Sequence, residues 1–163
     1  MFGKAITVVC GHYGAGKTNL SMNLAFDSSE STETTLIDLD IVNPYFRSSD
    51  YRAALEARGI RVIGPNFANT NADTPSLPPS VDVALARSDR VIIDAGGDDV
   101  GATVLGRYSE AIRSRGYDMI YVINMYRSMT QTPEEAVDIL HSIEAVSKLK
   151  ATGIVNNSHL KDR

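Results

Sequence analysis

Eight consecutive residues near the amino terminus carry the strongest chemical signal in the sequence. Gly11 to Thr18 form the string Gly-His-Tyr-Gly-Ala-Gly-Lys-Thr, which fits the phosphate-loop pattern Gly-x-x-x-x-Gly-Lys-Ser/Thr. Glycines let such a loop curl until backbone N–H groups point at phosphate oxygens, and a helix that follows adds the positive end of its dipole. In this pattern Lys17 is expected to hold the β- and γ-phosphates, and the Thr18 hydroxyl is expected to bind Mg²⁺.

Carboxylates at the ends of two apolar runs supply the other groups that a nucleotide and metal site needs. Asp38 and Asp40 end one run, and Asp94 follows another. Ligands gather at the carboxyl ends of parallel strands, so we expect these three carboxylates to converge on Lys17. Asp94 is predicted to lie in the outer coordination sphere of Mg²⁺. Asp38 or Asp40 is predicted to orient the attacking water or to contact the metal. The predicted catalytic residues are Lys17, Asp38 and Asp40, and the predicted metal residues are Thr18, Asp40 and Asp94.

Short apolar runs rich in Val and Ile alternate with helical patterns along the chain. Most of these runs are continuous, as expected for parallel strands that helices cover on both faces. Six strands are predicted, at Ala5–Cys10, Thr34–Leu39, Ile60–Ile63, Val91–Ile93, Met119–Ile123 and Thr152–Val155. Helices are predicted at Lys17–Phe26, Ser49–Arg58, Val81–Arg87, Leu105–Arg115 and Pro133–Leu149. The pattern therefore predicts a single-domain, three-layer α/β/α fold with a mostly parallel sheet over residues 1–163.

The last predicted helix has the best-marked start. Thr132 can cap it, Pro133 takes the first helical position, and Glu135 completes a Thr-x-x-Glu capping box. Its apolar residues recur at steps of three and four, which predicts one face that lies on the sheet. The segment Pro65 to Ser80 has no such periodicity, and we interpret it as a loop that is either a lid or a crossing.

Composition narrows the class of protein. The chain has 163 residues, close to the size of one domain, and its 43% hydrophobic and 22% charged content is typical of a globular fold. With 16 Lys and Arg against 20 Asp and Glu, the net charge of −4 argues against nucleic acid or an anionic membrane as a partner. A single cysteine, Cys10, forms no internal disulfide, and the sequence has neither a membrane span nor a signal peptide, which favours the cytoplasm.

Three of these motifs, in this order, carry a resemblance to a known family. Gly11 to Thr18, Asp38-Leu39-Asp40 and Asp94-x-Gly-Gly resemble the MinD/ParA branch of P-loop ATPases, in the signal-recognition-particle-like class. Within that branch the chain is most similar to bacterial ATP-binding proteins that share the segments found here at Asp38 to Arg47 and Gly96 to Asp99. The resemblance implies the P-loop NTPase fold, ATP with Mg²⁺, slow hydrolysis, and a shape or homodimer that the nucleotide controls.

One position departs from the MinD/ParA pattern. Those proteins carry a second lysine early in the phosphate loop, which reaches the partner's nucleotide across a dimer, and this chain has His12 there. A neutral imidazole replaces a permanent cation poorly, although it can gain a proton beside a phosphate. Arg47 is an alternative source of the charge, because a guanidinium grips phosphate oxygens with two hydrogen bonds. The sequence therefore leaves both catalysis within one chain and catalysis across a dimer open.

The resemblance also implies where the base lies. The resembling ATPases place an asparagine on the adenine edge at the end of the last predicted strand, here Asn156, and the loop after Asn124 flanks the nucleotide. The chain has no Asn-Lys-x-Asp sequence, the usual guanine reader, so ATP is favoured over GTP. We also expect a form truncated at its C-terminal end, because the chain stops six residues after Asn157. The predicted nucleotide contacts are Gly11, Tyr13, Gly14, Ala15, Gly16, Lys17, Thr18, Asn19, Asn124 and Asn156.

Together these features predict a nucleotide-controlled switch that binds ATP and hydrolyses it slowly with Mg²⁺. Asp40–Arg47 and Asp94–Asp99 are its predicted switch segments, and its output is the binding of a protein partner. One alternative is a small-molecule kinase or ATP-dependent ligase that resembles dethiobiotin synthetase, with Pro65–Ser80 covering the acceptor. A second alternative, which His12 favours, is a switch that binds nucleotide without significant turnover.

Overall fold

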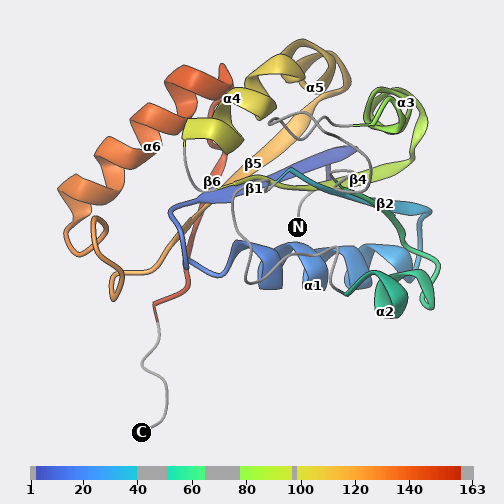
Figure 1. The fold of residues 1–163 in the computed structure, drawn as a ribbon, viewed down its shortest axis with the longest axis horizontal. Coiled ribbons are helices and arrows are strands. Elements are labelled where there is room, and N and C mark those ends of the chain that lie inside the picture. Colours follow the sequence, from blue (N-terminus) through green and yellow to red (C-terminus); the bar gives the residue numbers. More distant parts are fainter. Residues whose placement is uncertain (1–2, 40–50, 65–77, 97–98, 159–163) are drawn as a thin grey trace, which may run out of the picture.

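One six-stranded parallel sheet organises the chain (Figure 1). The computed structural model describes residues 3–39, 51–64, 78–96 and 99–158. Every strand pair in these residues is parallel, and the order across the sheet is β3-β2-β4-β1-β5-β6. The strands are β1 (Ile6–Gly11), β2 (Thr34–Asp38), β3 (Arg61–Ile63), β4 (Arg90–Asp94), β5 (Tyr117–Ile123) and β6 (Gly153–Asn156). All six predicted strands are confirmed to within two residues at either end.

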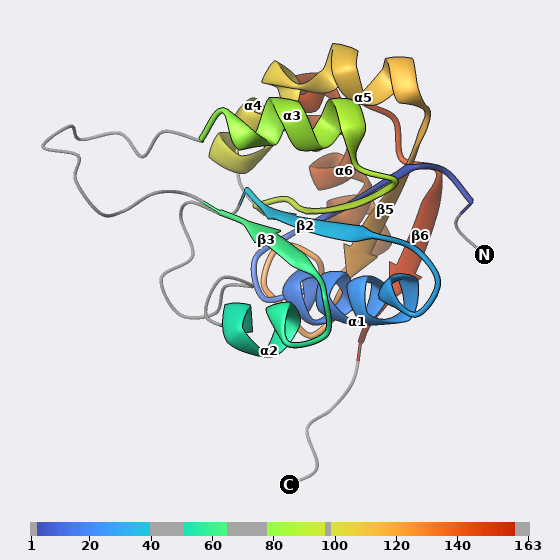
Figure 2. The same cartoon turned by 90° about the vertical axis from the view of Figure 1, so that its right-hand side faces the viewer.

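Helices cover both faces of this sheet. On one face lie α1 (Lys17–Ser29) and α2 (Arg52–Glu56). The other face carries α3 (Ser80–Arg87), α4 (Asp99–Arg107), α5 (Ser109–Arg115) and α6 (Pro133–Ser147), as Figures 1 and 2 show. The predicted three-layer α/β/α architecture is therefore confirmed.

The structure corrects one predicted helix. The sequence predicts a single helix over Leu105–Arg115, whereas the structure has α4 and α5 with a break at Tyr108, and α4 begins earlier. At Tyr108 the backbone leaves helical geometry, with φ −97° and ψ 3°, and the residue is buried. The break lets Leu105 and Ile112 both reach full burial in the core from separate helices. Tertiary packing has overridden the local helical pattern here.

The remaining helix predictions differ from the structure mainly at their ends. The helix predicted at Ser49–Arg58 is the shorter α2, and Gly59, with φ 76°, follows its last turn. The start of that prediction and most of the loop predicted at Pro65–Ser80 lie outside the described residues. The capping box of α6 is confirmed, because Thr132 Oγ1 accepts from Glu135 N (3.3 Å) and Glu135 Oε2 accepts from Thr132 N (3.2 Å).

The apolar core lies on both faces of the sheet. Val8 packs into the cluster under α3–α6, while its neighbour Val9 packs into a cluster beside α1. Successive side chains of a strand point to opposite faces, so a strand buried on both sides must be apolar throughout. Burial also raises the pKa of Cys10 to about 12, which keeps it a protonated thiol that packs as a small apolar residue. Among the described residues no helix combines the length and the hydrophobicity needed to cross a bilayer.

The backbone at the end of β1 leaves no room for a side chain. Gly11, paired with Val122 in the register, has φ 148°, and a Cβ atom there would lie 2.3 Å from the backbone oxygen of Val122. A backbone atom within a paired strand has little freedom to move away. Glycine is therefore required at the point where β1 turns into the loop that follows.

We predict that Gly11→Ala lowers the free energy of unfolding by about 3 kcal/mol, because the added methyl group forces β1 and β5 apart. Gly153→Ala in β6 is the matched control, since a Cβ atom added there would meet no atom within 4 Å beyond its chain neighbours. This control is expected to stay within about 0.5 kcal/mol of the wild type. Urea unfolding followed by circular dichroism measures both, and equal stability of the two variants would contradict the assigned contact.

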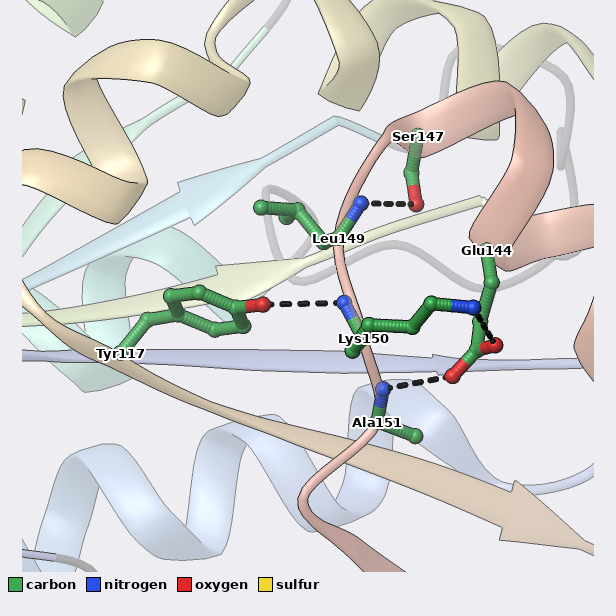
Figure 3. A network of polar contacts seen from close by, with 6 residues as sticks. All are labelled: Tyr117, Glu144, Ser147, Leu149, Lys150 and Ala151. Atoms are coloured by element: carbon green, nitrogen blue, oxygen red, sulfur yellow. Dashed lines mark hydrogen bonds and ion pairs between the residues drawn. The ribbon is translucent and has the colours of Figure 1, made fainter.

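A polar network fixes the end of α6 to the strand that follows (Figure 3). The Glu144 carboxylate accepts from Lys150 Nζ (2.7 Å) and from the backbone N–H of Ala151 (2.9 Å). Tyr117 OH accepts from the backbone N–H of Lys150 (2.9 Å). Burial raises the pKa of Glu144, but the hydrogen bonds from Lys150 and Ala151 outweigh it and leave the pKa below its ordinary value. The ionised carboxylate thus secures the reversal of the chain before β6.

We expect Glu144→Gln to lower the free energy of unfolding at pH 7 by about 1 kcal/mol. A carboxyl whose pKa is depressed in the folded state contributes stability above its unfolded pKa, and this contribution is lost as the pH falls through the folded pKa. The difference between wild type and variant should therefore shrink towards zero below about pH 4. Asp138→Asn, at an exposed position of the same helix, controls for the change of charge. A difference that stays constant from pH 7 to pH 3 would count against the network.

Candidate phosphate-binding site

The predicted phosphate loop connects the end of β1 to the start of α1, at the carboxyl edge of the sheet. Gly16 is the N-cap residue of α1 and adopts φ 93° and ψ 21°, a left-handed conformation that favours glycine. Because glycine has no side chain, the N-cap position offers no acceptor to the first N–H groups of the helix. Lys17 and Thr18 begin α1 and are both buried. The loop thus has the N–H groups and the cation that bind phosphate.

Three side chains from different parts of the chain donate hydrogen bonds to carbonyl groups of this loop. They are Lys17 Nζ to His12 O (3.2 Å), Arg127 Nε to Gly14 O (3.2 Å) and Asn157 Nδ2 to Ala15 O (2.8 Å). In a trans peptide the C=O and the next N–H point in opposite directions. These bonds therefore aim the N–H groups of Tyr13 and Gly16 away from the donors, while the N–H of Ala15 donates to His12 O within the loop (3.2 Å). The loop shape is fixed by tertiary contacts as well as by its own sequence.

Two buried carboxylates lie at the same edge of the sheet. Asp94 at the end of β4 pairs in register with Asp38 at the end of β2, and both are fully buried. Asp94 also pairs with Val9 of β1, and its Oδ1 accepts from Ser21 Oγ of α1 (3.2 Å). The structure therefore brings Asp38 and Asp94 together at this edge of the sheet and couples Asp94 to α1.

The groups in this corner fit Mg²⁺. Thr18 and Ser21 lie three residues apart on α1 and so share a face, which places the Thr18 hydroxyl towards the same corner as Asp94. Hydroxyl and carboxylate oxygens are ligands that Mg²⁺ prefers, and this ion keeps several waters and phosphate oxygens in its shell. No cluster of three or more His, Cys, Asp or Glu gathers within the described residues. The donor set is thus suited to an ion held largely by phosphate and water.

His12 does not add a cation to the loop. Burial lowers the pKa of His12 below its ordinary value, and the positive charge of Lys17 lowers it further. The imidazole is therefore neutral at pH 7 in this structure. Asp40, predicted for catalysis and metal binding, and Arg47, the predicted alternative cation, lie outside the described residues. The described cations at the loop are Lys17 and Arg127.

The remaining predicted contacts fall in two groups. Tyr13 and Asn19 are exposed, at the loop and in the first turn of α1. Asn124 is buried after β5, and its Oδ1 accepts from the backbone N–H of Tyr126 (3.0 Å). Asn156 is exposed, and its Oδ1 accepts from the backbone N–H of Ser158 (3.0 Å). Contact of Asn124 and Asn156 with a base stays a prediction.

The sequence patterns do not predict three residues that support this site. Ser21 orients Asp94, while Arg127 and Asn157 hold the phosphate loop. Each lies close in sequence to a predicted residue, but only the fold shows which side chain reaches the loop. Asn157 also lines a cavity of about 210 Å³ with Gly16, Asn19, Leu20, Asn23, Val122 and Val155.

Comparison with known proteins identifies the fold. No protein-family profile matches the chain, and no curated protein is similar in sequence. Solved structures with the same arrangement include the VpsO kinase domain (TM-score 0.67, 16% identity, 96% of this chain and 86% of that one). FtsY from Thermotoga maritima has a TM-score of 0.63 and 22% identity over 94% of this chain and 52% of its own. The BceF tyrosine kinase domain has a TM-score of 0.57 and 21% identity over 93% and 68%.

These structural neighbours are P-loop NTPases. The chain has the P-loop NTPase fold. At identities below 25% the likeness extends to the fold alone, and this chain spans about half the length of FtsY. The more specific resemblance to the MinD/ParA branch stays a prediction.

The two neighbouring asparagines at the end of β6, Asn156 and Asn157, allow a direct test of the site. Asn157→Ala removes the donor to Ala15 O, and we expect it to weaken binding of ATP and GTP equally, by about fivefold, because it loosens the loop. Asn156→Ala leaves the loop intact and, if Asn156 contacts adenine as predicted, weakens ATP alone. Calorimetric titration of both variants distinguishes these effects. Unchanged affinity in Asn157→Ala would show that Asn157 does not support the bound loop.

Proposed function

We propose that this chain binds ATP with Mg²⁺ at Gly11–Thr18 and hydrolyses it slowly, so that the bound nucleotide controls its shape and its binding of a protein partner. The observation that carries the proposal is the hydrogen bond from Ser21 to Asp94, which holds a buried carboxylate against the helix that begins at the phosphate loop, at the carboxyl edge of a parallel sheet. In open parallel sheets this edge is where ligands bind.

Each described residue has a separate task in this proposal. The loop N–H groups and the N-terminus of α1 bind phosphate oxygens, and Lys17 exchanges its hydrogen bond with His12 O for the β- and γ-phosphates. Thr18 and Asp94 hold Mg²⁺, which neutralises phosphate charge. Ser21 keeps the Asp94 carboxylate oriented. Asp38, register-paired with Asp94, is proposed to act on the attacking water.

ATP is the proposed nucleotide rather than GTP. The residues after β5 are Asn124-Met125-Tyr126-Arg127, so a cation stands where the Asn-Lys-x-Asp pattern needs the carboxylate that accepts from guanine. The positive Arg127 side chain donates to the phosphate loop instead. A guanidinium has no acceptor to offer to the guanine edge.

Phosphoryl transfer to an acceptor is the second candidate. Two structural neighbours, from VpsO and BceF, are named as kinase domains. His12 also stands where the MinD/ParA pattern has a second lysine, and the lack of that permanent cation favours low turnover without an acceptor. A switch that binds nucleotide without significant turnover is the third candidate, and a homodimer that the nucleotide controls belongs to the first.

The first experiment is calorimetric titration of the protein with ATP and GTP, each with and without Mg²⁺, followed by phosphate release from the same sample. We expect tight Mg²⁺-dependent ATP binding with slow release of phosphate. Lys17→Ala should abolish binding, whereas Lys148→Ala, an exposed lysine after α6, should bind like the wild type. Binding without release would favour the kinase candidate or the switch without turnover, and absence of binding in the wild type would overturn the proposal.

Asp94→Asn tests the metal assignment. The amide keeps the volume and a partner for Ser21 but removes the charge, so we expect Mg²⁺-dependent ATP affinity and turnover to fall by about 10- to 100-fold. Asp89→Asn, an exposed aspartate just before β4 at the opposite edge of the sheet, is the matched control. If both variants respond to Mg²⁺ like the wild type, Asp94 does not serve the metal.

A further inference from the structure

Arg127, in the turn between β5 and α6, lies directly against the phosphate loop. Its Nε donates to Gly14 O (3.2 Å). A Cβ atom at Gly14 would lie 3.0 Å from Arg127 Nε and 3.2 Å from its Cζ, so the guanidinium packs on the Gly14 backbone. Residues 113 positions apart in the chain are joined at the loop that binds phosphate.

The turn that carries Arg127 is held by its own hydrogen bonds. Arg127 N donates to Asn124 O (3.1 Å), and Arg127 O accepts from Thr130 N (3.3 Å) and from Thr130 Oγ1 (3.2 Å). Thr130 and Asn124 are both buried. The backbone N–H of Met125 donates to Ser158 Oγ (2.8 Å), which also ties the turn to the segment after β6. Arg127 is therefore presented to the loop from a fixed support.

A continuous chain of hydrogen bonds connects Arg127 with the phosphate-binding lysine. Arg127 Nε donates to the Gly14 carbonyl, and the N–H of that same peptide, which belongs to Ala15, donates to His12 O (3.2 Å). His12 O also accepts from Lys17 Nζ. Hydrogen bonds linked through a peptide group polarise and strengthen one another. Loss of Arg127 therefore weakens the hydrogen bond from Ala15 N to His12 O, which closes the turn of the phosphate loop.

The charge of Arg127 has no other described use. Among the described residues it forms no ion pair with a carboxylate, and its hydrogen bond to Gly14 O uses one of its five N–H donors. A charge-assisted bond of this kind is stronger than a neutral one. The guanidinium thus donates a charge-assisted hydrogen bond to a carbonyl of the phosphate loop.

We propose that Arg127 is a positioning residue that latches the phosphate loop to the β5–α6 turn and thereby slows the release of bound nucleotide. The inference rests on the proposed nucleotide binding at the same loop. Release requires the loop N–H groups to part from the phosphates, and the latch opposes the loop movement that separates them. The latch acts on the loop and not on the reacting atoms, so it sets the residence time of the nucleotide and leaves the rate of the chemical step unchanged.

The test is displacement of a fluorescent ATP analogue by excess ATP in stopped flow, with Mg²⁺ present, for the wild type, Arg127→Ala and Arg127→Lys. We expect release from Arg127→Ala to be about tenfold faster, and Arg127→Lys to recover most of the difference because it keeps a charged donor. Arg87→Ala, at an exposed position at the end of α3, removes the same charge away from the loop and should release like the wild type. Hydrolysis of pre-bound ATP in a single turnover should stay within about twofold for all variants.

Hydrogen exchange on the nucleotide-free proteins supplies a readout that needs no ligand. Faster amide exchange of Gly11–Gly16 in Arg127→Ala, at an unchanged melting temperature, would support the latch. Equal rates of nucleotide release in the wild type and Arg127→Ala would overturn the latch. Slower single-turnover hydrolysis at an unchanged release rate would also overturn it, because that result would mean that Arg127 contacts the reacting groups. If the wild type binds no ATP, the proposed function is overturned. The amide hydrogen exchange of Gly11–Gly16 would then still decide whether Arg127 holds the phosphate loop.

Discussion

The need for glycine at position 11 is the constraint on which the site depends. With φ 148°, any Cβ atom at Gly11 would meet the Val122 carbonyl, so only glycine lets β1 pair with β5 up to the residue where the phosphate loop begins. With β4 on its other side, β1 is central, and its carboxyl end is flanked by Asp94 and by the turn that carries Arg127. The sheet thus sets the position of the loop before any ligand is considered.

Local sequence signals were sufficient for those parts of the fold that depend on neighbouring residues. Eight consecutive residues are enough to predict the phosphate loop. The buried strands appear in the sequence as apolar runs because helices cover both faces of the sheet. The capping box of α6 is equally local. In contrast, the break at Tyr108 follows from the packing of Leu105 and Ile112, which a helical pattern does not contain.

The supports of the site could not be predicted, because they act between distant segments. Asn156 and Asn157 have the same chemistry, and the strand geometry alone decides which of them reaches Ala15 O. Arg127 lies in a turn whose residues give no local sign that one of them faces Gly14. Ser21 resembles any other small residue of a packed helix until Asp94 is placed beside it. The motifs therefore predict which residues bind the nucleotide, and the tertiary structure shows which side chains contact those residues.

The hydrogen bonds to the loop carbonyls also bear on how the chain folds during synthesis. Lys17 is part of the loop's own helix, but Arg127 and Asn157 belong to the last third of the sequence. Contacts between such distant segments form late, because the chain between them must first be ordered. A ribosome releases the amino-terminal segments first, so the loop emerges long before two of its three donors. The phosphate loop consequently reaches its final shape only near the completion of the fold, and an isolated peptide of the same sequence would lack it.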